Sequence, residues 1–238
     1  MVSRTPASRA MPLRPPDVRV ERVCLSGSAR DDYFAFRTAY FAEMLGWDVR
    51  NGEGVDRDAL DDVSIHFGLY EGSRLCGCIR LSPPDGGAWM IDQQPFSAMI
   101  DPGLDPRHPR NVSAEVSRFG IEPRVARLRD EHGFTMGQAL RRAAYQESLK
   151  LGLRYWYVVA YTSLLAALQR FDFLPLQMIG PSVSFDERSP TRVAALDLAQ
   201  AYREIALRSP RFLHWNNLGL SVAQVAVLAD GSGDRRAA

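Results

Sequence analysis

The sequence lacks any long hydrophobic run. No stretch reaches the roughly 18 consecutive apolar residues of a membrane-spanning helix, and the N-terminal MVSRTPASRAMPLRPP lacks the apolar core of a secretory signal peptide. A single sign of charge is also missing, because 29 Lys and Arg nearly balance 28 Asp and Glu and leave a net charge of +1. A chain of this balance has no overall field that attracts nucleic acid. We therefore expect neither a membrane span nor a nucleic-acid partner.

Cysteine is scarce. The chain has Cys24, Cys76 and Cys78, and the Cys-x-Cys pair has no second pair to complete a zinc site. The four histidines show no metal-ligand spacing. An odd, sparse set of thiols is typical of a reducing cytoplasm. We expect a cytoplasmic protein with packing cysteines and no metal.

Three motifs of covalent and nucleotide chemistry are missing as well. The sequence contains no serine nucleophile elbow, no Walker loop and no Gly-x-Gly-x-x-Gly turn. Serine-based covalent catalysis and nucleotide hydrolysis are therefore unsupported.

What is present is enough for one substantial core, since 46% of the 238 residues are hydrophobic. We expect a disordered leader over residues 1–17, a single domain over residues 18–220 and a flexible tail over residues 221–238.

The order of patterns predicts the fold class. A helical pattern and an acidic, glycine-rich loop come first, then three strand patterns, and then strands alternating with helices. We predict helices at 31–45, 134–152, 163–171 and 199–208, and strands at 64–70, 74–82, 112–123, 154–161, 174–180 and 191–198. Together they predict an α/β, three-layer αβα domain with a mixed, mostly antiparallel central sheet and helices on both faces.

The stretch AEVSRFGI places two opposite charges inside a predicted strand. Buried charges are costly unless they are paired or used. Strand alternation places Glu115 and Ser117 on one face, and Val116 and Arg118 on the other. The two charges can serve one site only if a β-bulge or bend near Val116–Ser117 brings them together. The alternative is an edge strand with both charges in solvent.

Two more arginines lie in apolar surroundings. Arg37 lies among aromatic residues of the first helix and Arg80 lies in the second hairpin strand, so each needs a carboxylate or a ligand. Asp58 and Asp61 of the acidic loop are the nearest supply. We expect a polar cluster in a cleft, with a snorkelling Arg37 and surface ion pairs as the alternatives.

Four motifs, in order, resemble those of the acyl-homoserine-lactone synthases, the LuxI-type autoinducer synthases. The chain has the family's Arg-x3-Phe-x5-Trp spacing, its paired acids, its strand arginine and its Glu-x-x-Arg. In this sequence they are Arg37, Phe41 and Trp47 in FRTAYFAEMLGWDVR, Asp58 and Asp61 in DRDALDD, Arg80 in GCIRL, and Glu115 and Arg118 in EVSRF.

The resemblance implies a GNAT-like fold and an N-acyltransferase of the EC 2.3.1 class with two substrates and no cofactor. One substrate is an acyl thioester, on acyl carrier protein or coenzyme A, and the other is S-adenosylmethionine. The amine is acylated, and the methionyl carboxylate then closes a lactone and expels methylthioadenosine. The product would be a diffusible quorum-sensing signal.

The resemblance also suggests roles for the motif residues. Glu115 is the candidate base for the amine, and Arg118 orients an acyl oxygen or a substrate carboxylate. Phe41 and Trp47 offer aromatic faces to a sulfonium cation. Arg37 holds the carboxylate or a neighbouring acid.

The resemblance also suggests residues that hold the acidic loop in place and residues that bind the acyl chain. Asp58 and Asp61 hold the loop in place, with Asp61 pairing to Arg80. An apolar tunnel for the acyl chain is expected among Met136, Leu140, Trp156, Val158, Leu164 and Leu168. Val158 stands where some members of the family carry a Thr associated with 3-oxo chains, which suggests an unsubstituted chain.

The acyl donor is harder to assign from sequence. Coenzyme A users of this fold often carry an Arg/Gln-x-x-Gly-x-Gly/Ala turn, of which GFTMGQAL keeps only Gly133 and Gly137. A basic patch lies beside it, comprising Arg124, Arg127, Arg129, Arg141 and Arg142. Such a patch steers an acidic carrier protein, so we favour acyl carrier protein over coenzyme A. A solvated basic face is the alternative, and the oligomeric state stays open.

Two rival functions share the fold. DDVSIHF and EVSRF also resemble N-acyl amino acid synthases and exosortase-associated acyltransferases, which release an open-chain acyl amino acid. Trp47 and the LGWDVR context favour the lactone synthase. A catalytically dead binding module is the third possibility, but it predicts a missing base or missing loop acids, and both are present.

Overall fold

The computed structural model describes residues 17–185 and 189–229. Within them a seven-stranded sheet runs in the order β1-β2-β3-β4-β5-β7-β6. Its strands are β1 (Val18–Arg22), β2 (Ile65–Glu71), β3 (Arg74–Ser82), β4 (Ser113–Ile121), β5 (Tyr155–Tyr161), β6 (Gln177–Met178) and β7 (Thr191–Asp197). Among these described strands, only β4 and β5 pair in parallel. The predicted mixed, mostly antiparallel sheet is confirmed.

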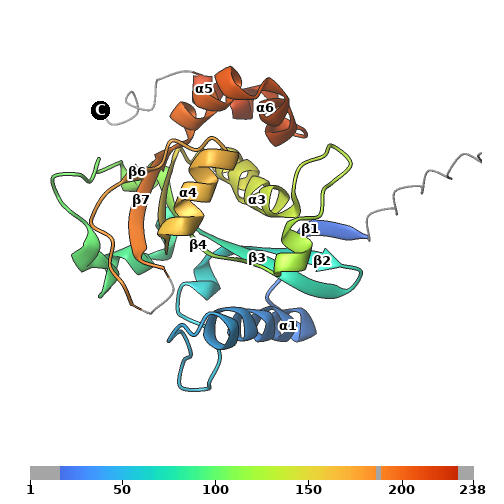
Figure 1. Cartoon of the computed structure of the whole chain (residues 1–238), viewed down its shortest axis with the longest axis vertical. Helices are drawn as coiled ribbons and strands as arrows, with labels where there is room; N and C mark the ends of the chain where they lie inside the picture. The colour runs from blue at the N-terminus through green and yellow to red at the C-terminus, as the bar shows by residue number, and fades with distance from the viewer. Residues whose placement is uncertain (1–16, 186–188, 230–238) are drawn as a thin grey trace, which may run out of the picture.

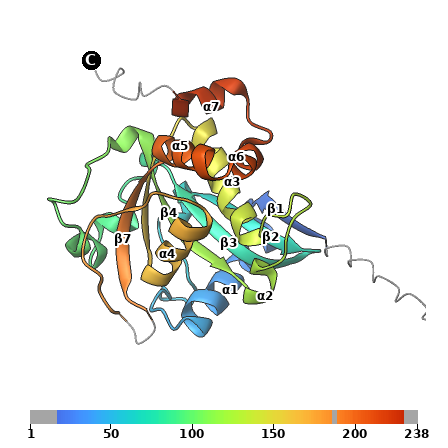
Figure 2. The same ribbon diagram turned by 45° about the horizontal axis from the view of Figure 1, so that its top comes forward.

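Helices cover both faces of the sheet, as predicted (Figure 1). The helix that precedes β2 lies on one face, and the two helices that flank β5 lie on the other. The helices are α1 (Gly27–Arg37), continued by a π-helical segment (Thr38–Met44), α2 (Pro123–Ala126), α3 (Met136–Lys150), α4 (Thr162–Phe171), α5 (Leu198–Arg208), α6 (Pro210–Asn217) and α7 (Val222–Ala229). The last three gather beside α3 (Figure 2).

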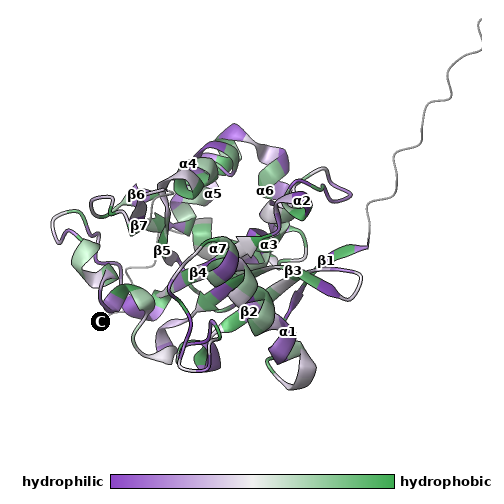
Figure 3. Ribbon diagram, turned by 60° about the horizontal axis from the view of Figure 1, so that its bottom comes forward, coloured by the Kyte–Doolittle hydropathy of each residue, from purple (hydrophilic) through white to green (hydrophobic). Residues whose placement is uncertain are grey.

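The central helix, α3, begins and ends where its sequence indicates. Thr135 caps its start, because the Thr135 hydroxyl accepts from the Gln138 amide at 3.2 Å while the Gln138 side chain accepts from the Thr135 amide at 2.9 Å. Gly152 follows its end with a φ of 71°, which suits glycine. Leu140 and Ala144 of α3 are fully buried in the main core. Helices α4 and α5 each carry hydrophobic and hydrophilic residues (Figure 3), as amphipathic helices on a sheet do.

The C-terminal region differs from the prediction of a flexible tail over residues 221–238. Residues Val222–Ala229 form α7, and Leu228 is buried in the main core. The stretch VAQVAVLA has almost no polar face, so its sequence shows no helical periodicity. The remainder of the predicted tail and residues 1–16 of the predicted leader lie outside the described residues.

The segment between β3 and β4 covers the sheet face opposite α3. It contains four short 3₁₀ turns: Pro84–Gly86, Met90–Asp92, Phe96–Met99 and Arg110–Val112. Another 3₁₀ turn, Asp61–Val63, precedes β2. Trp89, Ile91 and Met99 of this segment pack against Tyr157 and Val193 in a second hydrophobic cluster. The segment is therefore part of the core.

This packing depends on a close approach of two backbone segments at Gly180. The Asp101 amide donates to the Ile179 carbonyl at 2.8 Å, and a Cβ on Gly180 would lie 1.7 Å from the Met99 carbonyl oxygen. We expect Gly180→Ala to lower the free energy of unfolding by about 1–3 kcal/mol, as overpacking does. Urea unfolding measures the change. Gly52→Ala is the control because no atom lies within 4 Å of a Cβ there, and equal midpoints for both variants would contradict the prediction.

Candidate active site

A β-bulge in β4 brings Glu115 and Arg118 to the same face of the sheet. Arg80 of β3 pairs with Ser117, but Cys78 pairs with Gly120, so β4 has one extra residue between these pairs. Arg118 has a φ of 52°, in the left-handed region. The predicted bulge is present, but it follows Ser117 instead of lying at Val116–Ser117. The strain of a non-glycine residue at positive φ is typical of functional sites.

The bulge places Arg118 in a buried ionic cluster with the loop acids. The cluster comprises Arg37, Asp56, Asp58, Asp61, Arg80 and Arg118. Asp56 lies at its centre, accepting from Arg37 Nη2 at 2.8 Å and from Arg118 Nε and Nη2 at 3.0 Å. Three guanidinium groups thus face three carboxylates, and the predicted polar cluster is confirmed as an arrangement of residues.

Asp61 and Asp58 join the third arginine to the cluster. Arg80 Nη1 donates to Asp61 at 2.9 Å and to Asp58 at 2.6 Å, and Arg37 Nη1 also donates to Asp61. The predicted Asp61–Arg80 pair is therefore present. The Asp58 side chain is 35% exposed, while those of Asp61 and Arg80 are fully buried. Asp58 marks the solvent side of the cluster.

The arginines set the protonation of these acids. Burial alone would raise the pKa of Asp61, but Arg37 and Arg80 outweigh it and lower that pKa to about 2. Burial also opposes ionisation of Asp56, and Arg118 and Arg37 lower its pKa. Both acids are ionised at neutral pH, so each arginine keeps its counter-charge.

Glu115 lies beside the cluster in a different environment. Its side chain is fully buried, and burial raises its pKa against the opposing effects of the Ile91 amide, Arg80, Arg118 and Ser117. The Ile91 amide donates to Oε2 at 2.9 Å, and Oε1 has no hydrogen-bond partner among the described residues. A carboxylate with a raised pKa and an uncommitted oxygen suits a general base.

The aromatic motif residues border the same cluster. The guanidinium of Arg118 lies 5.8 Å from the Phe41 ring centroid, and Phe41 stacks on Trp47 at 5.2 Å. The Trp47 indole N–H donates to the Tyr161 hydroxyl at the end of β5. These rings connect the helix after α1 with β5, and the role of Phe41 and Trp47 toward a sulfonium cation stays a prediction.

The parallel strands β4 and β5 separate beside this site. Their pairing runs from Ser113–Tyr155 to Val116–Val158 and ends there, although both strands continue. Strands that diverge leave backbone N–H groups available to a ligand. The separation begins next to Glu115 and Ser117, so a ligand between the strands would meet the candidate base.

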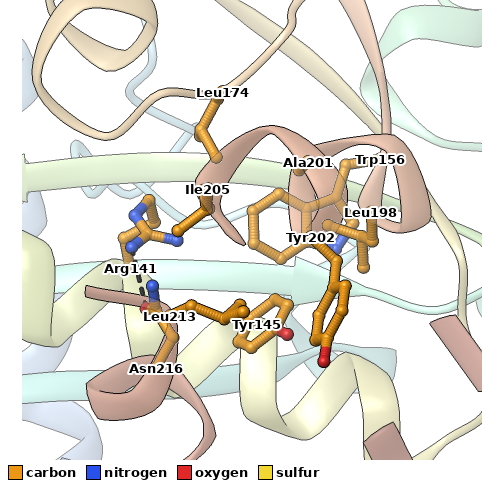
Figure 4. A pocket seen from close by; sticks show the side chains of 10 residues that line it. All are labelled: Arg141, Tyr145, Trp156, Leu174, Leu198, Ala201, Tyr202, Ile205, Leu213 and Asn216. Atoms are coloured by element: carbon orange, nitrogen blue, oxygen red, sulfur yellow. Dashed lines mark hydrogen bonds between the residues drawn. The ribbon is translucent and has the colours of Figure 1, made fainter. Parts of the chain in front are cut away.

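The predicted acyl-tunnel residues lie across the sheet from the ionic cluster. Met136 and Trp156 are buried in the main core, and Val158 packs against it. Trp156 also borders a small pocket between α3, β5, α5 and α6 (Figure 4), with Arg141 and Asn216 hydrogen-bonded at 3.1 Å. These residues belong to the core in this structure, and their role toward an acyl chain stays a prediction.

The predicted carrier-docking patch is smaller than expected. Arg141 is buried and pairs with Asp172 at 2.8 Å, so its assignment to a docking surface is wrong. Arg142 is half-buried and donates to the Leu218 carbonyl at 2.7 Å. Arg124 and Arg127 are exposed. The sequence pattern does not distinguish an arginine facing solvent from one that anchors α6.

Sequence reasoning missed Asp56 and the Ile91 amide. Asp56 is the first acid of DRDALDD, and only Asp58 and Asp61 matched the family spacing. Its position in a charge-rich loop was the one available signal in the sequence. No pattern predicts that the Ile91 amide, 24 residues before Glu115, contacts that carboxylate. Among the described residues, no group of three or more His, Cys, Asp or Glu is placed to hold a metal ion.

A comparison with known protein families shows to which family the chain belongs. Residues 22–201 match the autoinducer synthase family. The chain belongs to that family. Over 52 residues it is 40% identical to an acyl-homoserine-lactone synthase of Aeromonas salmonicida, which covers 21% of this chain and 25% of that protein. The chain thus matches only a quarter of the length of this curated relative.

Solved structures share the fold of this family member. BjaI, a CoA-dependent acyl-homoserine lactone synthase solved with MTA, has a TM-score of 0.60 at 19% identity over 84% of this chain and 98% of its own. FeeM, an N-acyl amino acid synthase from uncultured soil microbes, has a TM-score of 0.59 at 14% identity, over 79% of this chain and 95% of its own. The predicted GNAT-like fold is confirmed. The two scores are so close that the fold does not separate the two activities. None of the helices within the described residues is long and apolar enough to span a membrane.

Proposed function

We propose that this autoinducer synthase family member makes an N-acyl-L-homoserine lactone from an acyl thioester and S-adenosylmethionine and releases methylthioadenosine. One observation carries the proposal: Glu115 is a buried carboxyl group with a raised pKa and an uncommitted oxygen, beside three paired arginines and diverging strands. The reaction needs no cofactor, because the thioester and the sulfonium each carry a leaving group. We place it in the cytoplasm, where both substrates are made.

The first step is acyl transfer. Glu115 takes a proton from the amine, whose nitrogen attacks the thioester carbonyl; a C–N bond forms, the carbonyl C–S bond breaks, and the thiolate leaves. Backbone N–H groups where β4 and β5 separate stabilise the oxyanion. Arg118 Nη1 is the second donor, since in the described part of the chain it meets only the weak sulfur acceptor of Met90 at 3.6 Å.

The second step is ring closure. A carboxylate oxygen of the acylated product attacks its own γ-carbon, the bond from that carbon to the sulfonium breaks, and its electron pair neutralises sulfur as methylthioadenosine leaves. Phe41 and Trp47 are stacked beside Arg118 and offer aromatic faces to the cation. These aromatic faces favour the lactone synthase over an N-acyl amino acid synthase, whose acceptor carries no sulfonium.

Product analysis tests the function. The chain is expressed in a host that makes no homoserine lactones, and culture extracts are examined by mass spectrometry. We expect a homoserine-lactone fragment. A linear acyl amino acid would establish the FeeM-like alternative instead, and neither product from well-expressed protein would indicate a module without catalytic activity.

The acyl donor we propose is acyl carrier protein. At the start of α3, where a phosphate would bind helix amides, Asp130 accepts from the Phe134 amide at 2.9 Å and from the Trp215 indole at 2.7 Å. The Thr135 amide is taken by Gln138. The Asp130 carboxylate therefore occupies the position that a coenzyme A pyrophosphate would use, and its negative charge repels a pyrophosphate.

A kinetic comparison of the two acyl donors measures this preference directly. With the same acyl chain on both carriers, we expect kcat/KM for acyl carrier protein to exceed that for coenzyme A by at least about tenfold, the lower end of electrostatic steering, here by exposed Arg127 and by Arg124, which also pairs with Glu71. Raising the salt concentration is expected to reduce the difference. BjaI is CoA-dependent, and an equal or greater efficiency with coenzyme A here would show that this chain resembles it.

A further inference from the structure

His66 is a buried histidine to which the proposed mechanism assigns no step. It belongs to β2 and pairs with Arg80 across β2 and β3, so both side chains lie on the same face of the sheet. The residue is 2% exposed, and its ring lies 5.1 Å from the Tyr33 ring of α1. A polar side chain buried this deeply destabilises the fold unless its nitrogens have partners.

Both ring nitrogens of His66 have partners, and the partners settle which nitrogen carries the proton. Nε2 lies 2.9 Å from the backbone carbonyl oxygen of Asp61, and Nδ1 lies 3.1 Å from the Tyr33 hydroxyl. A carbonyl oxygen only accepts, so Nε2 carries the proton and donates it. Nδ1 is then bare, and the Tyr33 hydroxyl donates to it. The direction of hydrogen bonding therefore runs from Tyr33 through His66 to Asp61.

The His66 ring is neutral at pH 7. Burial lowers the pKa of His66 to about 4 by outweighing the contacts with Asp61, and Arg37 and Arg80 add to the lowering. A lysine or an arginine at this position would place another positive charge beside these two arginines. A neutral histidine donates to the backbone of the loop without changing the balance of charge in the cluster.

The residue that His66 holds, Asp61, is the one that binds two arginines of the cluster. Its carboxylate accepts from Arg80 Nη1 at 2.9 Å and also from Arg37 Nη1. Its second oxygen accepts from the Asp58 amide at 2.9 Å, and the Asp58 side chain accepts from Arg80 at 2.6 Å. The turn is fixed at the Asp61 carbonyl, so the place of both acids relative to Arg80 depends on the bond from His66.

Arg80 connects this turn to the bulged strand. Its Nε donates to the Ser117 hydroxyl at 3.0 Å, and Ser117 lies between Glu115 and Arg118 in the chain. Hydrogen bonds thus link α1, His66, the turn, Arg80 and β4 in that order. Displacing reacting groups by about 1 Å can lower a rate by about 100-fold, even when the substitution lies away from the chemistry.

We propose that His66 is a positioning residue, whose neutral Nε2–H form holds the Asp61 carbonyl and thereby sets the acids that orient Arg80. It acts through Asp61 and Arg80 instead of contacting the substrates. The inference rests on the proposed function and deepens it. A residue that only fills the core needs a buried ring, but it does not need the proton on one particular nitrogen.

The tautomer is measured on the wild-type chain. Long-range ¹H–¹⁵N correlation NMR of the histidine rings shows which nitrogen carries the proton. At pH 7 we expect the His66 proton on Nε2 and a bare Nδ1, whereas His132, whose side chain is 44% exposed, provides the reference for a ring that exchanges between both forms. A proton on Nδ1 would overturn the proposal, because Nε2 would then have nothing to donate to Asp61.

Two amide variants separate the two ends of the ring. Glutamine places its amide nitrogen near the position of Nε2, so His66→Gln keeps a donor for Asp61 and loses the acceptor for Tyr33. Asparagine reaches only as far as Nδ1, so His66→Asn loses the donor. Per folded enzyme, we expect kcat for acyl transfer to stay close to the wild-type value in His66→Gln and to fall by about 10- to 100-fold in His66→Asn.

The control for these rates is His132→Asn, which changes an exposed histidine and should keep the wild-type rate. Circular dichroism and chemical denaturation give the folded fraction of each variant. Equal losses in His66→Gln and His66→Asn, or a wild-type rate in His66→Asn, would show that His66 only packs.

Hydrogen exchange separates this inference from the proposed function. The Asp61 amide donates to the Asp58 carbonyl at 3.1 Å, and the Asp58 amide donates to the Asp61 carboxylate. We expect both amides to exchange about tenfold faster in His66→Asn than in His66→Gln, as loss of one hydrogen bond predicts.

The two failures are distinguishable. If the tautomer and the exchange rates are as expected but the wild type forms no acyl product with any thioester, the bond from His66 to the turn stands and the proposed reaction fails. If the wild type forms the lactone but the two variants exchange and react alike, the reaction stands and the inference about His66 fails.

Discussion

Glu115→Gln is expected to lower kcat for acyl transfer by about 10²- to 10⁴-fold, the usual contribution of a general base. Glutamine has the same shape and still accepts from the Ile91 amide, but it takes no proton from the amine. The fold should therefore persist while the chemistry fails. Continuous measurement of free thiol released from the acyl donor follows the reaction.

The pH profile gives this prediction a second signature. Burial raises the pKa of Glu115, and the base is active only when it is deprotonated. The rise of kcat/KM with pH should therefore occur above the range of an ordinary glutamate, and this limb should be absent in Glu115→Gln.

A surface glutamate supplies the control. Glu43 is exposed and pairs with Arg50 at 3.3 Å, so Glu43→Gln should keep both the wild-type rate and the wild-type profile. Full activity in Glu115→Gln would remove Glu115 from the mechanism.

Asp56→Asn is expected to have the largest effect on stability. Asp56 is fully buried and bonds both Arg37 and Arg118. Removing one partner from a buried ion pair leaves uncompensated charge and costs about 3–5 kcal/mol. The variant should also slow acyl transfer, because Arg118 loses the carboxylate that orients it.

Chemical denaturation measures the loss of stability, with Asp62→Asn as the matched control. Asp62 lies in the same loop, but it is exposed and, among the residues that the structure describes, pairs only with Arg57 at 3.1 Å, so little change is expected. Equal midpoints for Asp56→Asn and the wild type would show that the cluster does not stabilise the fold.

The cluster also predicts how the stability of the fold changes at acidic pH. The folded-state pKa of Asp61 is about 2, against an ordinary value of 3.8. A lowered pKa gives stability that is complete above the unfolded-state value and is lost as the pH falls through the folded-state value. Between pH 4 and pH 2 the wild type should therefore lose stability that Asp56→Asn, with its weakened cluster, has already partly lost.

The local sequence pattern was sufficient to predict most elements of the fold. The β2–β3 hairpin, β5, α3 and α5 lie where residue spacing predicted them, because their apolar periodicity and caps are properties of neighbouring residues. It failed for α7, whose apolar surface shows no period, and the strand predicted at 174–180 is reduced to the two residues of β6, which pair with β7.

By itself, the sequence determined that four short motifs of acids, arginines and aromatics occur in order, and that Glu115 and Arg118 need a bulge to serve one site. Only the tertiary structure decided where that bulge lies, that Asp56 joins Arg37 to Arg118, that Arg141 is buried, and that Arg80 keeps an uncommitted nitrogen. The physical reason is that each of these depends on hydrogen bonds between segments far apart in the chain. Residue type shows that a charge needs a partner, but the packing of the sheet decides which partner it has.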